Sequence, residues 1–129
     1  MKSITINDIK YNVGDTVYLV VNGEPTIKNV DNFKKCEITS ITNAGYIHVK
    51  VLFPLVMYMP YDVKVNKDGT SGKFTIMPYS DDFEQKLNAL RQNKTYIQNT
   101  FRRLKLVTKL SYEKAQKLNA LLDEFGVDK

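Results

Sequence analysis

Cysteine and histidine are almost missing from this sequence of 129 residues, which holds one of each, Cys36 and His48. A lone cysteine excludes an intramolecular disulfide. Cys36 follows Lys34 and Lys35, whose charges would lower a thiol pKa; the alternative is an ordinary strand thiol. A zinc site needs a cluster of Cys and His ligands that this chain lacks, and a single histidine removes most triad chemistry. We therefore expect no metal and no cofactor.

Long apolar runs and catalytic motifs are absent as well. No stretch approaches the ~20 apolar residues of a membrane span, and the opening MKSITINDIK lacks the apolar core of a signal peptide. Neither a glycine-rich phosphate loop nor a GxSxG elbow occurs. The acidic pairs at 81–82 and 123–124 fall at expected helix ends, where they act as caps. We expect a protein that acts in the cytoplasm of the cell that makes or hosts it, and one that binds a partner and is not an enzyme.

The composition suits a small folded domain with an anionic partner. Hydrophobic residues make up 43% of the chain and aromatic residues 11%, which is enough for a core. The length fits one compact domain, or a sheet module joined to a helical tail. The formal net charge of +5 and a pI near 9.2 favour a nucleic acid, a nucleotide or an acidic protein surface as partner.

The N-terminal part of the chain is patterned as short strands separated by turns such as Asn22-Gly23. Alternating or β-branched runs predict strands at 4–6, 13–21, 36–42, 46–51, 62–65 and 73–77. The segment 53–61 carries two prolines, so we expect an edge strand, a bend or a loop there. Its apolar content indicates that it packs under another element or forms an interface.

Helical patterning begins at Ser80. Asp81 is placed to cap a helix, with Glu84 completing a capping box. Apolar residues then form a heptad seam in which Lys94 takes the one missing place. The seam consists of Phe83, Leu87, Leu90, Ile97, Phe101 and Leu104. Such a seam expects a partner along its length.

A second helix is expected from Ser111 to Gly126, after a break near 107–110. The sequence therefore predicts an α+β fold, a small antiparallel β-sheet or barrel followed by an antiparallel two-helix hairpin. We expect residues 1–79 to be the β module. Residues 80–129 would form the hairpin, packed as one domain with the sheet or used as an oligomer interface.

Acidic residues are missing from 85 to 112, whereas seven basic residues occur there. They are Lys86, Arg91, Lys94, Arg102, Arg103, Lys105 and Lys109. One interpretation is a solvated surface, since exposed charges contribute little to stability. The other is an anion bound along the helix, because like charges repel and the i,i+4 acid–base pairs of a solvated helix are absent.

The stretch DDFEQKLNALRQN places an aromatic residue, Phe83, ten residues before an amide, Asn93. With the order of a small sheet and then two helices, it resembles the phage anti-Thoeris sponge proteins, the first family of Thoeris anti-defence proteins. The resemblance implies a phage counter-defence protein that sequesters a cyclic nucleotide immune signal, a cyclic ADP-ribose isomer, without cleaving it. It also implies a homo-oligomer, a dimer or larger, with ligand pockets between protomers.

The resemblance implies that Phe83 and Asn93 bind the adenine of the ligand. The alternatives are a core position for Phe83 and a solvated one for Asn93. Candidates for the phosphates are chosen by charge, namely Lys28, Lys94, Arg102, Arg103 and Lys109. Two other interpretations stay open: an SH3-like adaptor or inhibitor that binds nucleic acid or an acidic protein partner, and a structural subunit whose seam forms an oligomer.

Overall fold

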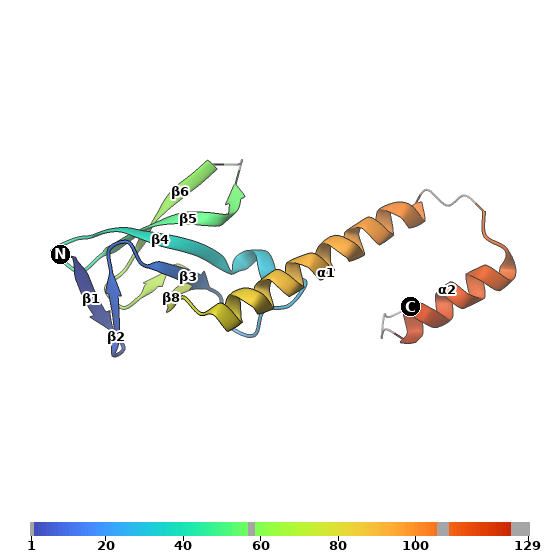
Figure 1. The fold of residues 1–129 in the computed structure, drawn as a ribbon, viewed down its shortest axis with the longest axis horizontal. Coiled ribbons are helices and arrows are strands. Elements are labelled where there is room, and N and C mark those ends of the chain that lie inside the picture. The colour runs from blue at the N-terminus through green and yellow to red at the C-terminus, as the bar shows by residue number, and fades with distance from the viewer. Residues whose placement is uncertain (1, 57–58, 106–108, 125–129) are drawn as a thin grey trace. The chain divides into compact units, whose positions relative to one another are not determined.

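The computed structural model describes residues 2–56, 59–105 and 109–124. The chain divides into two compact units, 1–94 and 95–129, and each is described by itself. The strands are β1 (Ser3–Ile6), β2 (Ile9–Asn12), β3 (Thr16–Val20), β4 (Lys34–Ile41), β5 (Ile47–Val56), β6 (Met59–Val65), β7 (Thr70–Ser71) and β8 (Phe74–Pro78). The helices are the 3-10 helix η1 (Val30–Asn32) and the α-helices α1 (Asp81–Lys105) and α2 (Tyr112–Glu124) (Figure 1). The expected α+β class, an antiparallel sheet followed by two helices, is confirmed.

Six strands form one curled antiparallel sheet in the order β6-β5-β4-β3-β8-β7, and β1 and β2 form a separate hairpin (Figure 1). The sheet curls like half of a barrel. The β1–β2 turn is made by Asn7 and Asp8, both with positive φ, as a tight two-residue hairpin turn requires. Two hydrogen bonds tie the following residues to β4, from the Gly14 amide to the Ile38 carbonyl (2.8 Å) and from the Ile38 amide to the Asp15 carbonyl (3.0 Å).

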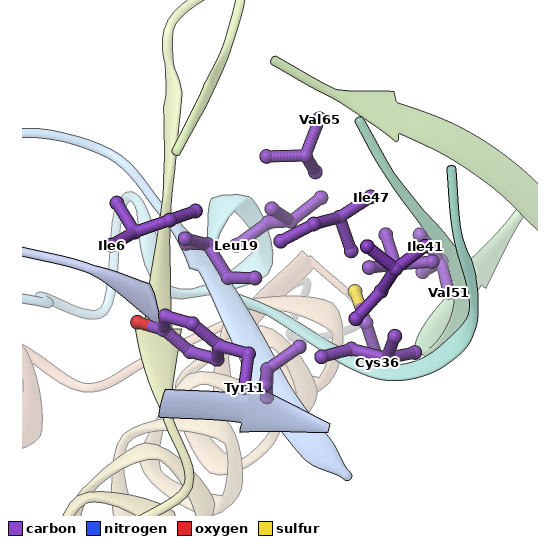
Figure 2. Packing of buried hydrophobic residues seen from close by; sticks show 12 residues of the cluster. Ile6, Tyr11, Leu19, Cys36, Ile41, Ile47, Val51 and Val65 are labelled. Atoms are coloured by element: carbon purple, nitrogen blue, oxygen red, sulfur yellow. The ribbon is translucent and has the colours of Figure 1, made fainter. Parts of the chain in front are cut away.

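The main core lies on the inner face of the curled sheet. Alternation along β3 turns Val17 and Leu19 inward, as strand geometry dictates. Fully buried residues of β4, β5 and β6 join them, namely Cys36, Ile38, Ile47, Val49, Val51 and Val65. Ile6 and Tyr11 of the β1–β2 hairpin approach the same core from the other side (Figure 2). The hairpin therefore closes the inner face against water.

A second core lies on the opposite face of the sheet, where Tyr18 points outward from β3. Tyr18, Val30, Phe33 and Leu87 are all buried together there. The first turns of α1 thus cover the outer face, and the segment with η1 fills the space beside them. At about 25 cal/mol per Å² of apolar area, such burial outweighs any intrinsic preference of the helix. The heptad seam accordingly begins against the chain's own sheet.

Several local expectations need correction. Ser80 caps α1, because its hydroxyl accepts the Phe83 amide (3.3 Å); Asp81 is the first helical residue. β2 was not expected, since its turn has no glycine to mark it. The proline-rich segment 53–61 is neither a bend nor a loop where it is described, because it extends β5 and opens β6. The edge expectation holds for β6, which ends the sheet.

The second unit holds the end of α1 and all of α2. The Ser111 hydroxyl accepts the Lys114 amide (3.2 Å), which confirms Ser111 as the cap of α2. The expected break at 107–110 falls partly on 106–108, and the expected end at Gly126 falls on 125–129; both stretches lie outside the described residues. No residue described between 95 and 124 is buried. The described residues of this unit therefore form no hydrophobic core in a single protomer.

Candidate anion-binding surface

Phe83 belongs to the outer core. Its ring meets Tyr18 edge-on, with 5.0 Å between centroids, and Phe33 at 6.0 Å in the same edge-on manner. Such pairs add to the stability that burial already provides. The core alternative for Phe83 therefore describes its place in the fold. The contact between Phe83 and an adenine stays a prediction. It would require a ligand to approach a side of the ring that does not pack against Tyr18 or Phe33.

A polar link beside Phe83 fastens α1 to β3. The Tyr18 hydroxyl donates to Glu84 Oε2 at 2.7 Å and lies 3.1 Å from the Ser80 carbonyl oxygen. Burial, and then the Glu84 carboxylate, raise the pKa of Tyr18, so the phenol keeps its proton and remains a donor. Lys35 Nζ lies 3.6 Å from the other oxygen of Glu84. Glu84 therefore binds the sheet and does not close a capping box.

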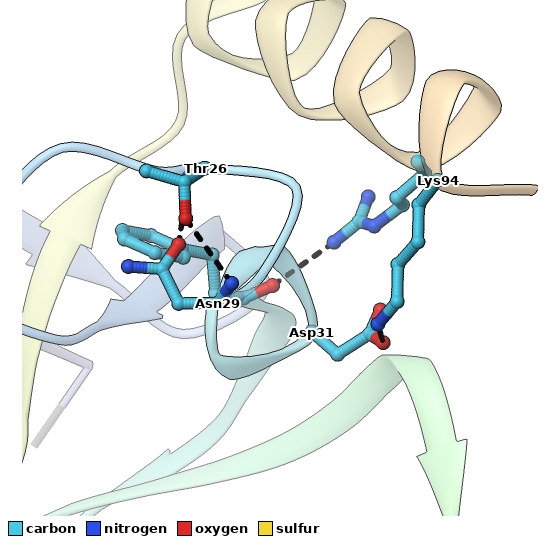
Figure 3. Close-up of polar contacts among 6 residues, drawn as sticks. Thr26, Asn29, Asp31 and Lys94 are labelled. Carbon is cyan, nitrogen blue, oxygen red and sulfur yellow. Dashed lines mark hydrogen bonds and ion pairs between the residues drawn. The ribbon is translucent and has the colours of Figure 1, made fainter. Parts of the chain in front are cut away.

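The basic residues in the first half of α1 face the chain's own sheet module. Lys86 pairs with Glu24 at 2.7 Å. Lys94 pairs with Asp31 of η1, and Arg91 donates to the Phe33 carbonyl at 3.0 Å (Figure 3). The Arg91 guanidinium also lies 4.5 Å from the centre of the Phe53 ring, and burial lowers the pKa of Arg91. Two of these three charges are thus paired with carboxylates of the sheet module, and the third lies against a carbonyl and an aromatic ring.

The loop before η1 is ordered so that Asp31 meets Lys94. The Thr26 amide donates to Asn29 Oδ1 at 2.7 Å, and the Asn29 amide donates to Thr26 Oγ1 at 3.3 Å (Figure 3). Val30 and Phe33 anchor the two ends of η1 in the outer core. A lysine in a heptad seam is costly unless its amine reaches a partner. Here the partner is a carboxylate of the same chain.

The basic residues in the second half of α1 are differently placed. Arg102, Arg103 and Lys105 are exposed, and residues 95–112 contain no acid at all. Arg102 donates to the Asn99 side chain at 3.3 Å. Tyr96 is 71% exposed, and it shares a helix face with Arg103, two turns further on. Arg102 and Lys105 lie one turn apart on another face of the same helix. The exposed group at the end of α1 made of Tyr96, Arg102, Arg103 and Lys105 is called the distal basic surface below.

Charge counts agree with this division. Residues 1–94 hold twelve Lys and Arg against ten Asp and Glu, whereas 95–129 hold seven against four. All four acids of the second unit lie at or beyond 113, in α2 and the residues after it. The positive charge per residue is therefore highest at the end of α1 and in the residues that follow it, up to 112.

The structure separates the residues that the sequence grouped as one site. Phe83 is in the core, and Asn93 is exposed ten residues, or about 15 Å, further along α1 on another face. Lys94 is held by Asp31. Lys28 is exposed in the loop before η1. Arg102 and Arg103 are exposed neighbours on α1, and Lys109 is exposed beyond its end.

Sequence reasoning missed the partners of the first basic residues. Glu24 and Asp31 lie more than 60 residues before Lys86 and Lys94. No local spacing rule links residues so distant, because such pairs exist only once α1 has docked on the sheet. A surplus of acids in the segment before β4 was the only available signal, and it is weak.

The described residues hold no group of three or more His, Cys, Asp or Glu placed to share a metal ion. Neither α1 nor α2, as far as each is described, is long and apolar enough to cross a bilayer. Comparisons with known proteins gave no family, since no family description, no curated protein and no solved structure matches the chain. The resemblance to the anti-Thoeris sponge proteins therefore stays a prediction.

Proposed function

We propose that this protein is a non-catalytic binding protein of the cytoplasm whose distal basic surface holds the phosphodiester backbone of a nucleic acid. The observation that carries the proposal is the division of α1. Three basic residues in its first half meet groups of the sheet module, whereas Arg102, Arg103 and Lys105 in its second half lie exposed in an acid-free stretch.

A nucleic acid fits the distal basic surface better than a small-molecule ligand does. Small-molecule sites are concave and bury most of their ligand, whereas the distal basic surface runs along one exposed helix. Cations spread along an element neutralise successive phosphates, and an exposed aromatic ring offers a stacking platform for a base. Tyr96 supplies such a ring beside Arg103.

Sequestration of a cyclic ADP-ribose isomer is the narrower hypothesis, and it needs a pocket between protomers. It depends on the resemblance and on the homo-oligomer that the resemblance implies. The exposed second half of the seam, Ile97 and Phe101, favours self-association. In that case a phage counter-defence role would follow from removal of a signal and would need no chemistry.

Fluorescence anisotropy with a labelled single-stranded oligonucleotide tests the proposal. We expect the triple variant R102Q/R103Q/K105Q to weaken binding at least tenfold at moderate salt. The matched control K2Q/K10Q/K50Q removes the same charge from exposed positions of the first unit and should weaken binding by less than threefold. Equal loss of affinity in both variants would show that only the net charge matters, and would overturn the assignment of the distal basic surface as the binding site.

Isothermal titration with cyclic ADP-ribose isomers tests the narrower hypothesis on the same protein. Sequestration requires nanomolar affinity, about −12 kcal/mol. Binding of that strength, insensitive to salt and lost in Asn93→Ala, would favour a sponge over a nucleic-acid binder. Absence of heat at micromolar protein would remove the sponge hypothesis and leave the nucleic-acid proposal standing.

A further inference from the structure

Two aromatic rings of the sheet module each lie beneath a pair of lysine ammonium groups. The Tyr46 ring has Lys64 Nζ at 4.1 Å and Lys67 Nζ at 5.5 Å from its centre. The Phe74 ring has Lys34 Nζ at 5.8 Å and Lys73 Nζ at 5.4 Å. These are called the Tyr46 cluster (Tyr46, Lys64 and Lys67) and the Phe74 cluster (Phe74, Lys34 and Lys73).

Strand register builds the Tyr46 cluster. Lys64 of β6 lies directly opposite His48 of β5, and Tyr46 is two residues before His48, on the same side of the chain. Lys67 arrives from the turn after β6, where its stem passes Gly45; a Cβ there would lie 3.4 Å from Lys67 Cγ. Gly45 also has φ +96°, a conformation that favours glycine. Two separate elements therefore bring the two amines to one ring.

The Phe74 cluster lies at the other end of β4. Lys34 begins β4 opposite Leu19, and Leu19 is also paired with Ile76 of β8, two residues after Phe74. The far end of β4, at Ile41, pairs with Ile47, which follows Tyr46. An eight-residue strand spans about 26 Å at roughly 3.3 Å per residue. The two clusters thus lie near opposite ends of β4.

The charges of both clusters are unbalanced by acids. No ion pair joins Lys34, Lys64, Lys67 or Lys73 to a carboxylate in the described part of the chain. Asp68 is next to Lys67, but its carboxylate accepts the amide and the hydroxyl of Thr70, at 3.0 and 2.6 Å. Two ammonium groups over one ring repel each other, and a phosphate held between them would relieve that repulsion.

We propose that the Tyr46 cluster and the Phe74 cluster are two phosphate-binding points of the sheet module, which contact the backbone of the nucleic acid. The proposal rests on the proposed function, because it names a further surface for the same class of ligand. Each ring holds its two lysines in place through cation–π contact, so that their stems lose less freedom when phosphate binds. The points would act on phosphate and not on base identity.

Oligonucleotide binding by the full chain tests this assignment in two double variants, K64Q/K67Q and K34Q/K73Q. Each should weaken binding at least threefold and make the plot of log affinity against log salt less steep by about 0.7, since each cluster is one phosphate contact and a single-strand contact contributes about 0.7. The matched control K2Q/K10Q removes two charges from exposed positions outside both clusters and should change the slope by less than about 0.3.

The outcomes separate the two proposals. Double variants that behave like the control, while R102Q/R103Q/K105Q loses binding, overturn the sheet assignment alone. Loss in the double variants with full binding by the triple variant overturns the distal basic surface and keeps the sheet points. Absence of binding by the unmodified chain overturns both. Thermal melting of every variant checks that the glutamine substitutions leave the fold intact.

Discussion

Phe83 shows how one residue supports two interpretations until its neighbours are known. In the sequence it is both the first position of a heptad seam and an aromatic residue suited to an adenine. In the fold its ring packs against Tyr18 and Phe33. These two ring contacts place Phe83 in the outer core. Its contribution to stability can therefore be measured by removing the ring.

Phe83→Ala should lower the free energy of unfolding by about 2–4 kcal/mol, because it removes a half-buried ring and leaves a cavity. Chemical denaturation at low protein concentration measures the change. Phe101→Ala is the matched control on the same helix, since Phe101 is 56% exposed and should cost under about 1 kcal/mol. Equal costs for the two variants would contradict the core assignment.

Cys36 is the residue whose chemistry the sequence leaves open, because the two preceding lysines would activate a thiol. The fold buries it completely, and burial raises the pKa of the Cys36 thiol to about 12. At pH 8 the reactive thiolate is then about one part in ten thousand. Iodoacetamide should therefore label the native protein at least a hundredfold more slowly than the protein in concentrated guanidinium chloride. Similar rates in the two states would disprove burial.

At the scale of elements, sequence patterns predicted most of the sheet and the start of α2, whereas the cap of α1 is Ser80 and not the expected Asp81. β3, β4, β5 and β8 follow from alternation, and Ser111 caps α2 as expected. The β1–β2 hairpin was not predicted, because its turn is made by Asn7 and Asp8 and contains no glycine. The ion pairs of the first basic residues of α1 were not predicted for a different reason. Their partners are remote in sequence and come close only when the helix docks on the sheet.

The Lys94–Asp31 pair should contribute to that docking. In a double-mutant cycle with Lys94→Ala and Asp31→Ala, we expect a coupling of about 0.5–1 kcal/mol that weakens as salt is added. The more exposed Lys86–Glu24 pair is the control, and its coupling should be smaller. Coupling energies in the reverse order would mean that the two pairs do not differ in burial as described.

The second half of the seam should mediate self-association. Ile97 and Phe101 are exposed, and no described residue of 95–124 is buried, so a partner surface would supply the core that this unit lacks. Analytical ultracentrifugation should detect oligomers whose population falls in Ile97→Asn/Phe101→Asn. The control Leu121→Asn removes an exposed apolar residue from α2 and should have less effect. A monomer at every concentration would exclude this role for the seam.

At the scale of the whole molecule, the protein combines a double-cored sheet module with a basic helical end. The outer core fixes the first half of α1, and ion pairs neutralise it. The net charge of +5 is therefore not spread evenly along the acid-free stretch. The charge available to a ligand is concentrated at the end of α1 and, on the sheet, at the Tyr46 and Phe74 clusters. This distribution is the basis of the proposal that the protein binds phosphate groups of a nucleic acid.

The salt dependence of oligonucleotide binding tests the central claim most directly. Log affinity should fall steeply and linearly with log salt for the unmodified chain, and R102Q/R103Q/K105Q should reduce the slope by about 2, since three phosphate contacts would be lost. K2Q/K10Q/K50Q should leave the slope nearly unchanged. A slope near zero for the unmodified chain, or one that all these variants share, would contradict the account.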